Sequence, residues 1–181
     1  MRLFLGFSAA DAERRIYDCC QGLPLDPGLP LRWVPPENWH VTLVFLGEVS
    51  EHLLLSLAEI TEPVISACQR MSLSMVGLEW FPSPSKARLL AMTAEAPEAL
   101  SGLQASLVAA LGREGFHTEN RRYRPHLTLA RYRGARKRFA PPALPEIKPI
   151  EIPLQEVTLF QSLPGKGAPV YQPLQYFELA S

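Results

Sequence analysis

The stretch ENWHVTLVFLG, residues 37–47, is an apolar strand pattern interrupted by two polar residues, His40 and Thr42. Its HVTL core, at positions 40–43, returns as HLTL at positions 126–129. The chain contains only four histidines and six threonines, so composition alone rarely produces this doubling. The repeat predicts two related strands, one in each half of the chain.

Strand geometry gives the repeat a consequence for side-chain placement. In a β-strand, residues two apart point to the same face and lie roughly 6.6 Å apart along it. His40 and Thr42 therefore share one face, as do His126 and Thr128, while the apolar residues between them pack on the other. If a pseudo-two-fold axis relates the halves, the two strands meet and bring both pairs into one cleft.

Such a cleft would suit phosphodiester chemistry without a metal ion or another cofactor. Two imidazoles, which titrate at about pH 6.5 when unperturbed, can divide the work of general acid and general base. Two threonine hydroxyls can donate hydrogen bonds to the non-bridging oxygens of a phosphodiester. Arg131, five residues after His126, can stabilise charge that develops in the transition state. Together these groups can open a cyclic phosphate.

Other interpretations of the histidines have less support. A single His-x-Thr in a strand is more often structural, with threonine favoured by its β propensity, but the duplication argues against that here. A zinc site would need ligand spacing that His40 and His126, far apart in the sequence, do not show. A Ser-His-Asp hydrolase would need a G-x-S-x-G motif, and neither this motif nor a nucleotide-binding glycine loop is present.

The remaining chain alternates strand and helix patterns and predicts an α+β (mixed α/β) fold. Helices are expected over residues 9–22, 51–69 and 97–115, with Pro63 kinking or breaking the second. The two halves show the same rhythm, and residues 134–149 are expected to form an exposed loop. Strands are expected over residues 2–8, 31–34, 37–47, 71–81, 87–94, 125–132, 150–162 and 170–180.

Composition is that of a globular protein, with 47% apolar and 20% charged residues and a formal net charge of zero. Eight of the eighteen Lys and Arg residues fall in the segment 121–138, which indicates either an anion-attracting surface or a solvated basic loop. The first apolar run is too short for a signal peptide, and no run is long enough for a membrane span. Three cysteines without disulfide or zinc spacing favour the cytoplasm.

These features resemble a known family. The paired His-x-Thr-x motifs resemble the two-histidine (2H) phosphoesterase superfamily. Their flanks are similar to its bacterial and archaeal branch, the RNA 2′,3′-cyclic phosphodiesterases once named 2′-5′ RNA ligases (the LigT or ThpR family). The similarity is carried by RLFLGFS at residues 2–8, RWVPPENWHVTLVFLGEV at 32–49, RPHLTLAR at 124–131 and VYQPLQYFEL at 170–179. It implies two pseudo-symmetric lobes whose antiparallel sheets flank a central cleft, with residues 1–181 forming one domain.

The resemblance also implies an activity, the metal-independent hydrolysis of a terminal RNA 2′,3′-cyclic phosphate to a 2′-phosphomonoester. In that family the histidine of the first motif donates a proton and that of the second accepts one from water. These roles fall to His40 and His126, while Thr42 and Thr128 would hold the phosphate.

Three further residues are expected to bind substrate. Arg131 matches the arginine that follows the family's second motif and would contact phosphate. Phe45, assigned by strand parity to the face of His40, could line the nucleotide side of the cleft, although it could equally be an ordinary core residue. Tyr171 matches an aromatic residue near the family's C-terminus.

Two other functions stay open. One is a nucleotide-binding module that no longer turns over substrate, and the other is RNA joining through a 2′-5′ linkage, the reverse reaction. The expected partner is RNA or a nucleotide with a 2′,3′-cyclic phosphate end, with small cyclic phosphates related to NADP or ADP-ribose as alternatives. The protein is expected to be a monomer.

Overall fold

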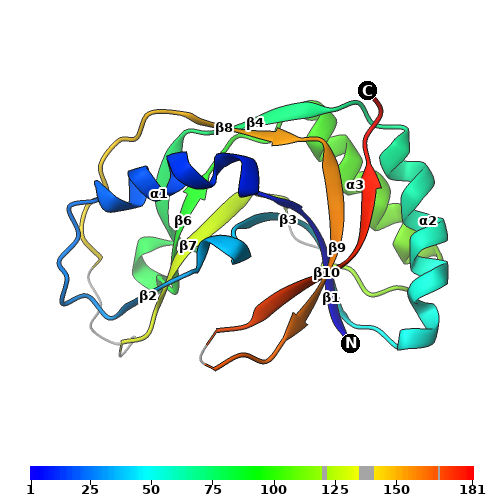
Figure 1. Cartoon of the computed structure of the whole chain (residues 1–181), viewed down its shortest axis with the longest axis horizontal. Coiled ribbons are helices and arrows are strands. Elements are labelled where there is room, and N and C mark those ends of the chain that lie inside the picture. Colours follow the sequence, from blue (N-terminus) through cyan, green and yellow to red (C-terminus); the bar gives the residue numbers. More distant parts are fainter. Residues whose placement is uncertain (120–121, 135–140, 167) are drawn as a thin grey trace.

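An antiparallel sheet and three α-helices dominate the computed structural model, which describes residues 1–119, 122–134, 141–166 and 168–181 (Figure 1). The helices are α1 (Glu13–Gln21), α2 (Leu54–Ser66) and α3 (Glu98–Arg113). The strands are β1 (Arg2–Ser8), β2 (Leu31–Trp33), β3 (His40–Glu48), β4 (Met71–Met75), β5 (Gly77–Phe81), β6 (Leu89–Thr93), β7 (His126–Tyr132), β8 (Ile150–Leu154), β9 (Glu156–Leu163) and β10 (Val170–Glu178). The predicted α+β class is confirmed.

The main sheet joins the two halves of the chain. Its strand order is β10-β9-β1-β3-β7-β6-β5, with β2 also paired to β7, and each of these pairings is antiparallel. The two motif strands, β3 and β7, are neighbours at its centre and share one bridging pair, Val41 with Leu127. The halves of the sheet therefore meet where the two motifs meet.

Two of the expected strands are each split into two. Residues 71–81 form β4 and β5, and residues 150–162 form β8 and the larger part of β9, because the chain changes sheets at Val76 and at Gln155. β4 and β8 pair with each other in a separate two-stranded sheet that runs along the top of the view in Figure 1. An apolar strand pattern has the same alternation in either sheet, so these breaks were not predicted.

Pro63 does not break α2. The helix continues through it from Leu54 to Ser66 and packs against α3 and β10. Proline removes the N–H that would bond to the carbonyl of Glu59, but both residues are exposed, so water can reach that carbonyl. The expected break is wrong because the affected turn faces solvent.

The buried apolar side chains form one continuous cluster. In Figure 1, α1 lies beside the half of the sheet that holds β6 and β7, whereas α2 and α3 lie beside the half with β9 and β10. The cluster draws on both halves, with members including Leu5, Ile16, Leu46, Leu57, Leu90, Leu107, Leu127 and Leu159. This shared core supports the proposal that residues 1–181 form one domain. In the described part of the chain, we find no helix long and apolar enough to cross a membrane.

Candidate active site

The pairing of β3 with β7 fixes how the two motifs face each other. The bridging pair lies inside the motifs, between histidine and threonine, and both of its side chains are fully buried. In this antiparallel register His40 lies opposite Thr128, and Thr42 lies opposite His126. The four polar side chains therefore share one face, with the two histidines on its diagonal, where Cα atoms are roughly 7–8 Å apart. The two His-Thr pairs meet as predicted.

Both motif strands carry a β-bulge just after the threonine. The pairing of β3 with β1 leaves Leu43 as an extra residue, and the pairing of β7 with β6 leaves Leu129 as one. An extra residue shifts the alternation by one position, so the fifth residue after each histidine turns back to the cleft face. These residues are Phe45 and Arg131, and both are exposed.

The bulge corrects the argument made for Phe45. Strict alternation would have put this residue on the face opposite to His40 and Thr42, so parity was the wrong reason. The expected placement nevertheless holds, because Phe45 lines a pocket together with Thr42 and His126, and 42% of its surface is exposed. Phe45 is therefore not an ordinary core residue.

Each imidazole is held by the backbone two residues before it. Nδ1 of His40 lies 2.7 Å from the carbonyl oxygen of Asn38, and Nδ1 of His126 lies 2.9 Å from that of Arg124. A carbonyl oxygen can only accept, so Nδ1 carries the proton and donates in both rings. In each neutral ring Nε2 is then the nitrogen that carries the lone pair, and it is the atom that can accept a proton.

The two rings have different aromatic neighbours. The ring centre of His40 lies 4.8 Å from that of Phe4 and 4.9 Å from that of Tyr171, which meets it edge-on, with Phe160 slightly farther away. Tyr171, which the sequence placed near the site, thus packs directly on a motif histidine. These contacts enclose the ring of His40 and restrict its rotation.

Enclosure changes the titration of His40. The pKa of His40 is lowered to about 4, and burial is the largest cause. The hydrogen bond to the Asn38 carbonyl acts in the opposite direction, whereas the positive charges of His126 and Arg131 add to the lowering. In the unliganded protein this ring is therefore neutral at pH 7. A phosphate anion in the cleft would oppose this effect, because a negative charge favours the protonated imidazole.

His126 is stacked instead of enclosed. Its ring lies parallel to that of Phe81, with centres 4.5 Å apart, and the guanidinium of Arg124 lies 4.7 Å from the centre of the Phe81 ring. Arg124 also donates to Glu79 at 2.7 Å. Phe81 and the Arg124–Glu79 pair thus support the His126 side of the cleft, and sequence reasoning assigned them no role.

Asn38 is a second residue that the sequence analysis missed. Its side chain is buried, with Nδ2 donating to the carbonyl of Pro169 at 2.9 Å and Oδ1 accepting from the backbone N–H of Tyr171 at 3.2 Å. Its backbone carbonyl meanwhile accepts from His40. One residue therefore couples a motif histidine to the segment that carries Tyr171. The only signal was a polar residue two positions before the histidine.

Comparison with known proteins assigns a family to this geometry. The family model of the 2′-5′ RNA ligase superfamily matches residues 25–166. The chain belongs to this superfamily. It is 33% identical over 153 residues to a protein of Methanothermobacter thermautotrophicus, covering 82% of this chain and 83% of the relative, and 35% identical over 161 residues to one of Aeropyrum pernix, covering 85% and 89%. Both relatives are named RNA 2′,3′-cyclic phosphodiesterase.

Solved structures in the comparison share the whole fold of this superfamily member. A protein of Thermus thermophilus matches with a TM-score of 0.82 at 25% identity, covering 98% of this chain and 97% of that one. LigT of E. coli complexed with 3′-AMP matches with a TM-score of 0.77 at 25% identity, covering 99% and 98%. The resemblance seen in the sequence is therefore confirmed at the level of family and fold.

Two pockets in this superfamily member lie on either side of the bridging pair. The larger, about 210 Å³, contains Thr42 and His126, and its wall includes Phe45, Phe81, Tyr123, Arg122 and Arg124. The smaller, a crevice of about 20 Å³, contains His40 and Thr128, and its wall includes Arg32, Arg131 and Tyr171. Each histidine thus shares a pocket with the threonine of the other motif, which the sequence alone could not show.

The basic segment 121–138 contributes to both sides of the cleft. Arg122 and Arg124 line the larger pocket, and Arg131 lines the smaller one. Arg121 and residues 135–140 lie outside the described residues. In the described part, the segment places cationic groups at the motifs of this superfamily member and is more than a solvated loop.

Proposed function

We propose that this protein is a metal-independent phosphodiesterase that hydrolyses the terminal 2′,3′-cyclic phosphate of RNA to a 2′-phosphomonoester. One observation carries the proposal: the two motif histidines lie on the diagonal of one strand-pair face, each with Nδ1 bonded to the backbone carbonyl two residues before it. The names of the relatives from Methanothermobacter thermautotrophicus and Aeropyrum pernix support this activity.

The diagonal suits an in-line displacement at phosphorus. Nε2 of His126 takes a proton from water, whose oxygen forms a new bond to phosphorus opposite O3′. The P–O3′ bond breaks, and O3′ receives the proton from Nε2 of His40. The attacking and leaving oxygens lie on opposite sides of the phosphorus atom, so an acid and a base at diagonal positions of the same face can serve both. The phosphate stays on O2′.

The remaining groups hold the reacting phosphate and the nucleoside. The hydroxyls of Thr42 and Thr128 lie between the two histidines and donate to the non-bridging oxygens. Arg131 stabilises the charge that develops on them. Phe45, at the other end of the cleft face, offers its exposed ring to the base by stacking. Tyr171 lines the pocket of His40 and also orients that ring.

Independence of a metal ion is part of the proposal, and the EDTA assay below tests it. Among the described residues, no group of three or more His, Cys, Asp or Glu side chains is placed to hold one. We also propose a location in the cytoplasm, in keeping with three free cysteines. We further propose that the protein is a monomer, whose core is shared by both halves of the chain.

The test is an assay of a defined oligonucleotide that ends in a 2′,3′-cyclic phosphate. The wild-type protein should produce a 2′-phosphate in the presence of EDTA. His40→Asn and His126→Asn should each lower the rate by roughly 10²- to 10⁴-fold, the usual contribution of a general acid or base. His52→Asn, at an exposed histidine remote from the motifs, is the matched control and should leave the rate unchanged.

Other results would separate the alternatives. Loss of activity with EDTA and recovery with zinc would contradict the metal-free reaction. Tight binding of nucleoside monophosphates without turnover of any cyclic phosphate would indicate a binding module. Joining of two RNA halves under the same conditions would show that the reverse reaction also takes place.

A further inference from the structure

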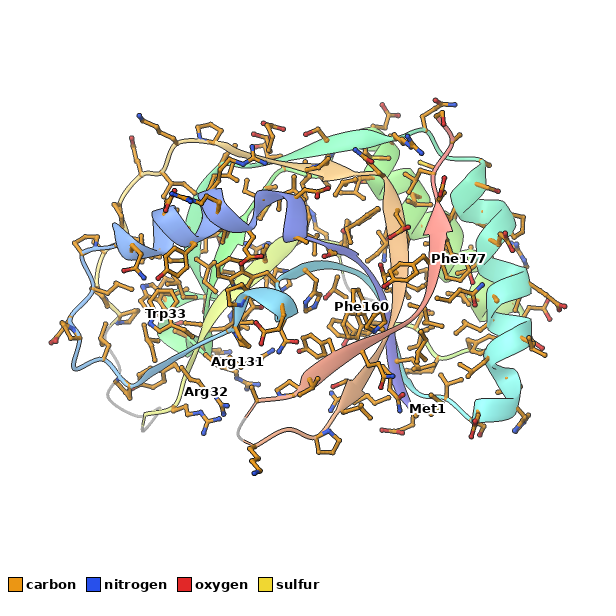
Figure 2. All side chains as sticks on the ribbon, viewed as in Figure 1. Met1, Arg32, Trp33, Arg131, Phe160 and Phe177 are labelled. Carbon is orange, nitrogen blue, oxygen red and sulfur yellow. The ribbon has the colours of Figure 1, made fainter. Side chains whose placement is uncertain are left out.

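Two arginines face each other at the outer end of the smaller pocket. Arg32 of β2 and Arg131 of β7 are direct partners across antiparallel strands. Such partners point to the same face with their Cβ atoms roughly 5 Å apart, and like charges in this position are destabilising. Figure 2 shows the two side chains as neighbours at this edge of the molecule.

Nothing in the described protein neutralises this pair. Neither arginine forms an ion pair or a side-chain hydrogen bond with a described residue. The described residues that line the pocket include His40 and Thr128 but no aspartate or glutamate. An anion bound at each guanidinium group would replace the repulsion with charge-assisted contacts. The pair is therefore arranged for negative charge that the described residues do not supply.

The proposed reaction fixes which part of the substrate points toward this pair. If His40 protonates O3′, then C3′ and its neighbour C4′ lie toward the His40 end of the cleft. C1′, which carries the base, then lies toward Phe45 at the other end. C5′ is bonded to C4′, so the 5′ substituent leaves the ribose on the side of Arg131 and Arg32.

The number of hydrogen-bond donors near the reacting phosphate indicates that the two arginines bind different groups. A reacting cyclic phosphate has two non-bridging oxygens, and Thr42, Thr128 and Arg131 already provide donors for them. Arg32 lies one strand farther out, on β2, and its guanidinium carries five N–H donors. Resting on the proposed function, we propose that Arg32 binds the phosphate on the 5′ side of the terminal nucleotide. The protein would thereby select RNA ends over nucleoside 2′,3′-cyclic monophosphates, which lack that phosphate.

Kinetics on a pair of substrates tests the proposal. Adenosine 2′,3′-cyclic phosphate is compared with the same compound carrying a 5′-phosphate. The wild-type protein should have a kcat/KM at least about tenfold higher on the 5′-phosphorylated compound, as expected for a charge-assisted hydrogen bond. Arg32→Gln should remove this preference, with the larger fall in kcat/KM on the 5′-phosphorylated compound. Arg32→Lys should keep part of the preference, because it keeps the charge but loses bidentate geometry.

Arg113→Gln, at an exposed arginine at the end of α3, is the control for general loss of positive charge and should keep the full preference. Equal wild-type rates on the two substrates would overturn the proposal. So would an equal loss on both in Arg32→Gln, because Arg32 would then act on the reacting phosphate or on the fold.

A binding measurement tests the 5′-phosphate subsite at Arg32 independently of catalysis. Adenosine 2′-monophosphate and adenosine 2′,5′-bisphosphate are titrated into the wild-type protein and Arg32→Gln. The substitution should weaken binding of the bisphosphate at least about tenfold and that of the monophosphate less than about twofold. If neither cyclic phosphate is hydrolysed but this difference is found, the proposed function fails and the subsite stands. Equal weakening of both ligands would overturn the subsite.

Discussion

Binding of an anion in the cleft should return a proton to His40, and the structure sets the size of the effect. Burial lowers the pKa of His40 to about 4 in the unliganded protein. A unit negative charge about 4 Å from Nε2 stabilises the protonated ring by roughly 4 kcal/mol at an effective dielectric constant of about 20. That energy changes the protonation equilibrium by roughly a thousandfold, because about 1.4 kcal/mol corresponds to a factor of ten.

Because anion binding and protonation of His40 are coupled, the effect can be measured as a change in anion affinity with pH. An anion that favours protonated His40 binds more tightly as the pH falls, by up to about tenfold per pH unit between roughly pH 7 and pH 4. Sulfate is a suitable probe because its own charge does not change over this range. Its dissociation constant is measured by calorimetry at several pH values for the wild-type protein and for His40→Asn, in which position 40 cannot titrate.

The variant removes one titrating group and leaves the other. Any other titrating group is present in both proteins, so the difference between the two profiles reports His40. The wild-type affinity should depend more steeply on pH, by about one proton. Parallel profiles would refute the reasoning, as would NMR titrations in which the ring of His40 protonates at the same pH with and without sulfate.

Four further predictions concern stability. Because the pKa of His40 is about 4 in the folded protein against a reference of 6.5, the folded state binds fewer protons between these pH values. The free energy of unfolding should fall by roughly 3 kcal/mol as the pH drops through that window, and urea unfolding should show a smaller fall in His40→Asn. Asn38→Ala removes two side-chain hydrogen bonds and should lower the free energy of unfolding by roughly 1–3 kcal/mol. It should also lower kcat more than it raises KM. A free energy of unfolding within about 0.5 kcal/mol of that of the wild type would contradict this prediction. Gly6→Ala would place a Cβ 2.9 Å from the backbone oxygen of Val41 and should destabilise by roughly 1–3 kcal/mol. Gly102→Ala in α3, where nothing lies within 4 Å of the added methyl, should instead stabilise slightly in the same urea assay.

The two motifs have the same geometry and different surroundings. Each histidine donates to the carbonyl two residues before it, and each strand has its bulge at the same place. His40 is nevertheless enclosed by aromatic rings, whereas His126 is stacked on one ring at a more open pocket. Burial lowers the pKa of His40, and a division of two histidines into acid and base requires surroundings that differ in this way.

Alternation along the chain was sufficient for much of the site. The HVTL and HLTL patterns alone put His40 with Thr42 and His126 with Thr128 on polar faces, because side chains two apart in a strand point the same way. The same local rules predicted the α+β class, and the flanking residues pointed to the family. The strand faces and the fold class depend on interactions between residues near each other in the sequence, and the family is read directly from the order of the residues.

Tertiary structure decided the rest. The register that sets His40 opposite Thr128, the bulge that turns Phe45 to the cleft and the pairing of Arg32 with Arg131 each join segments far apart in the sequence. The role of Asn38 likewise depends on a segment that follows it by more than a hundred residues. Such contacts are chosen by packing and hydrogen bonding over the whole chain, and local alternation carries no information about which distant strand becomes the neighbour.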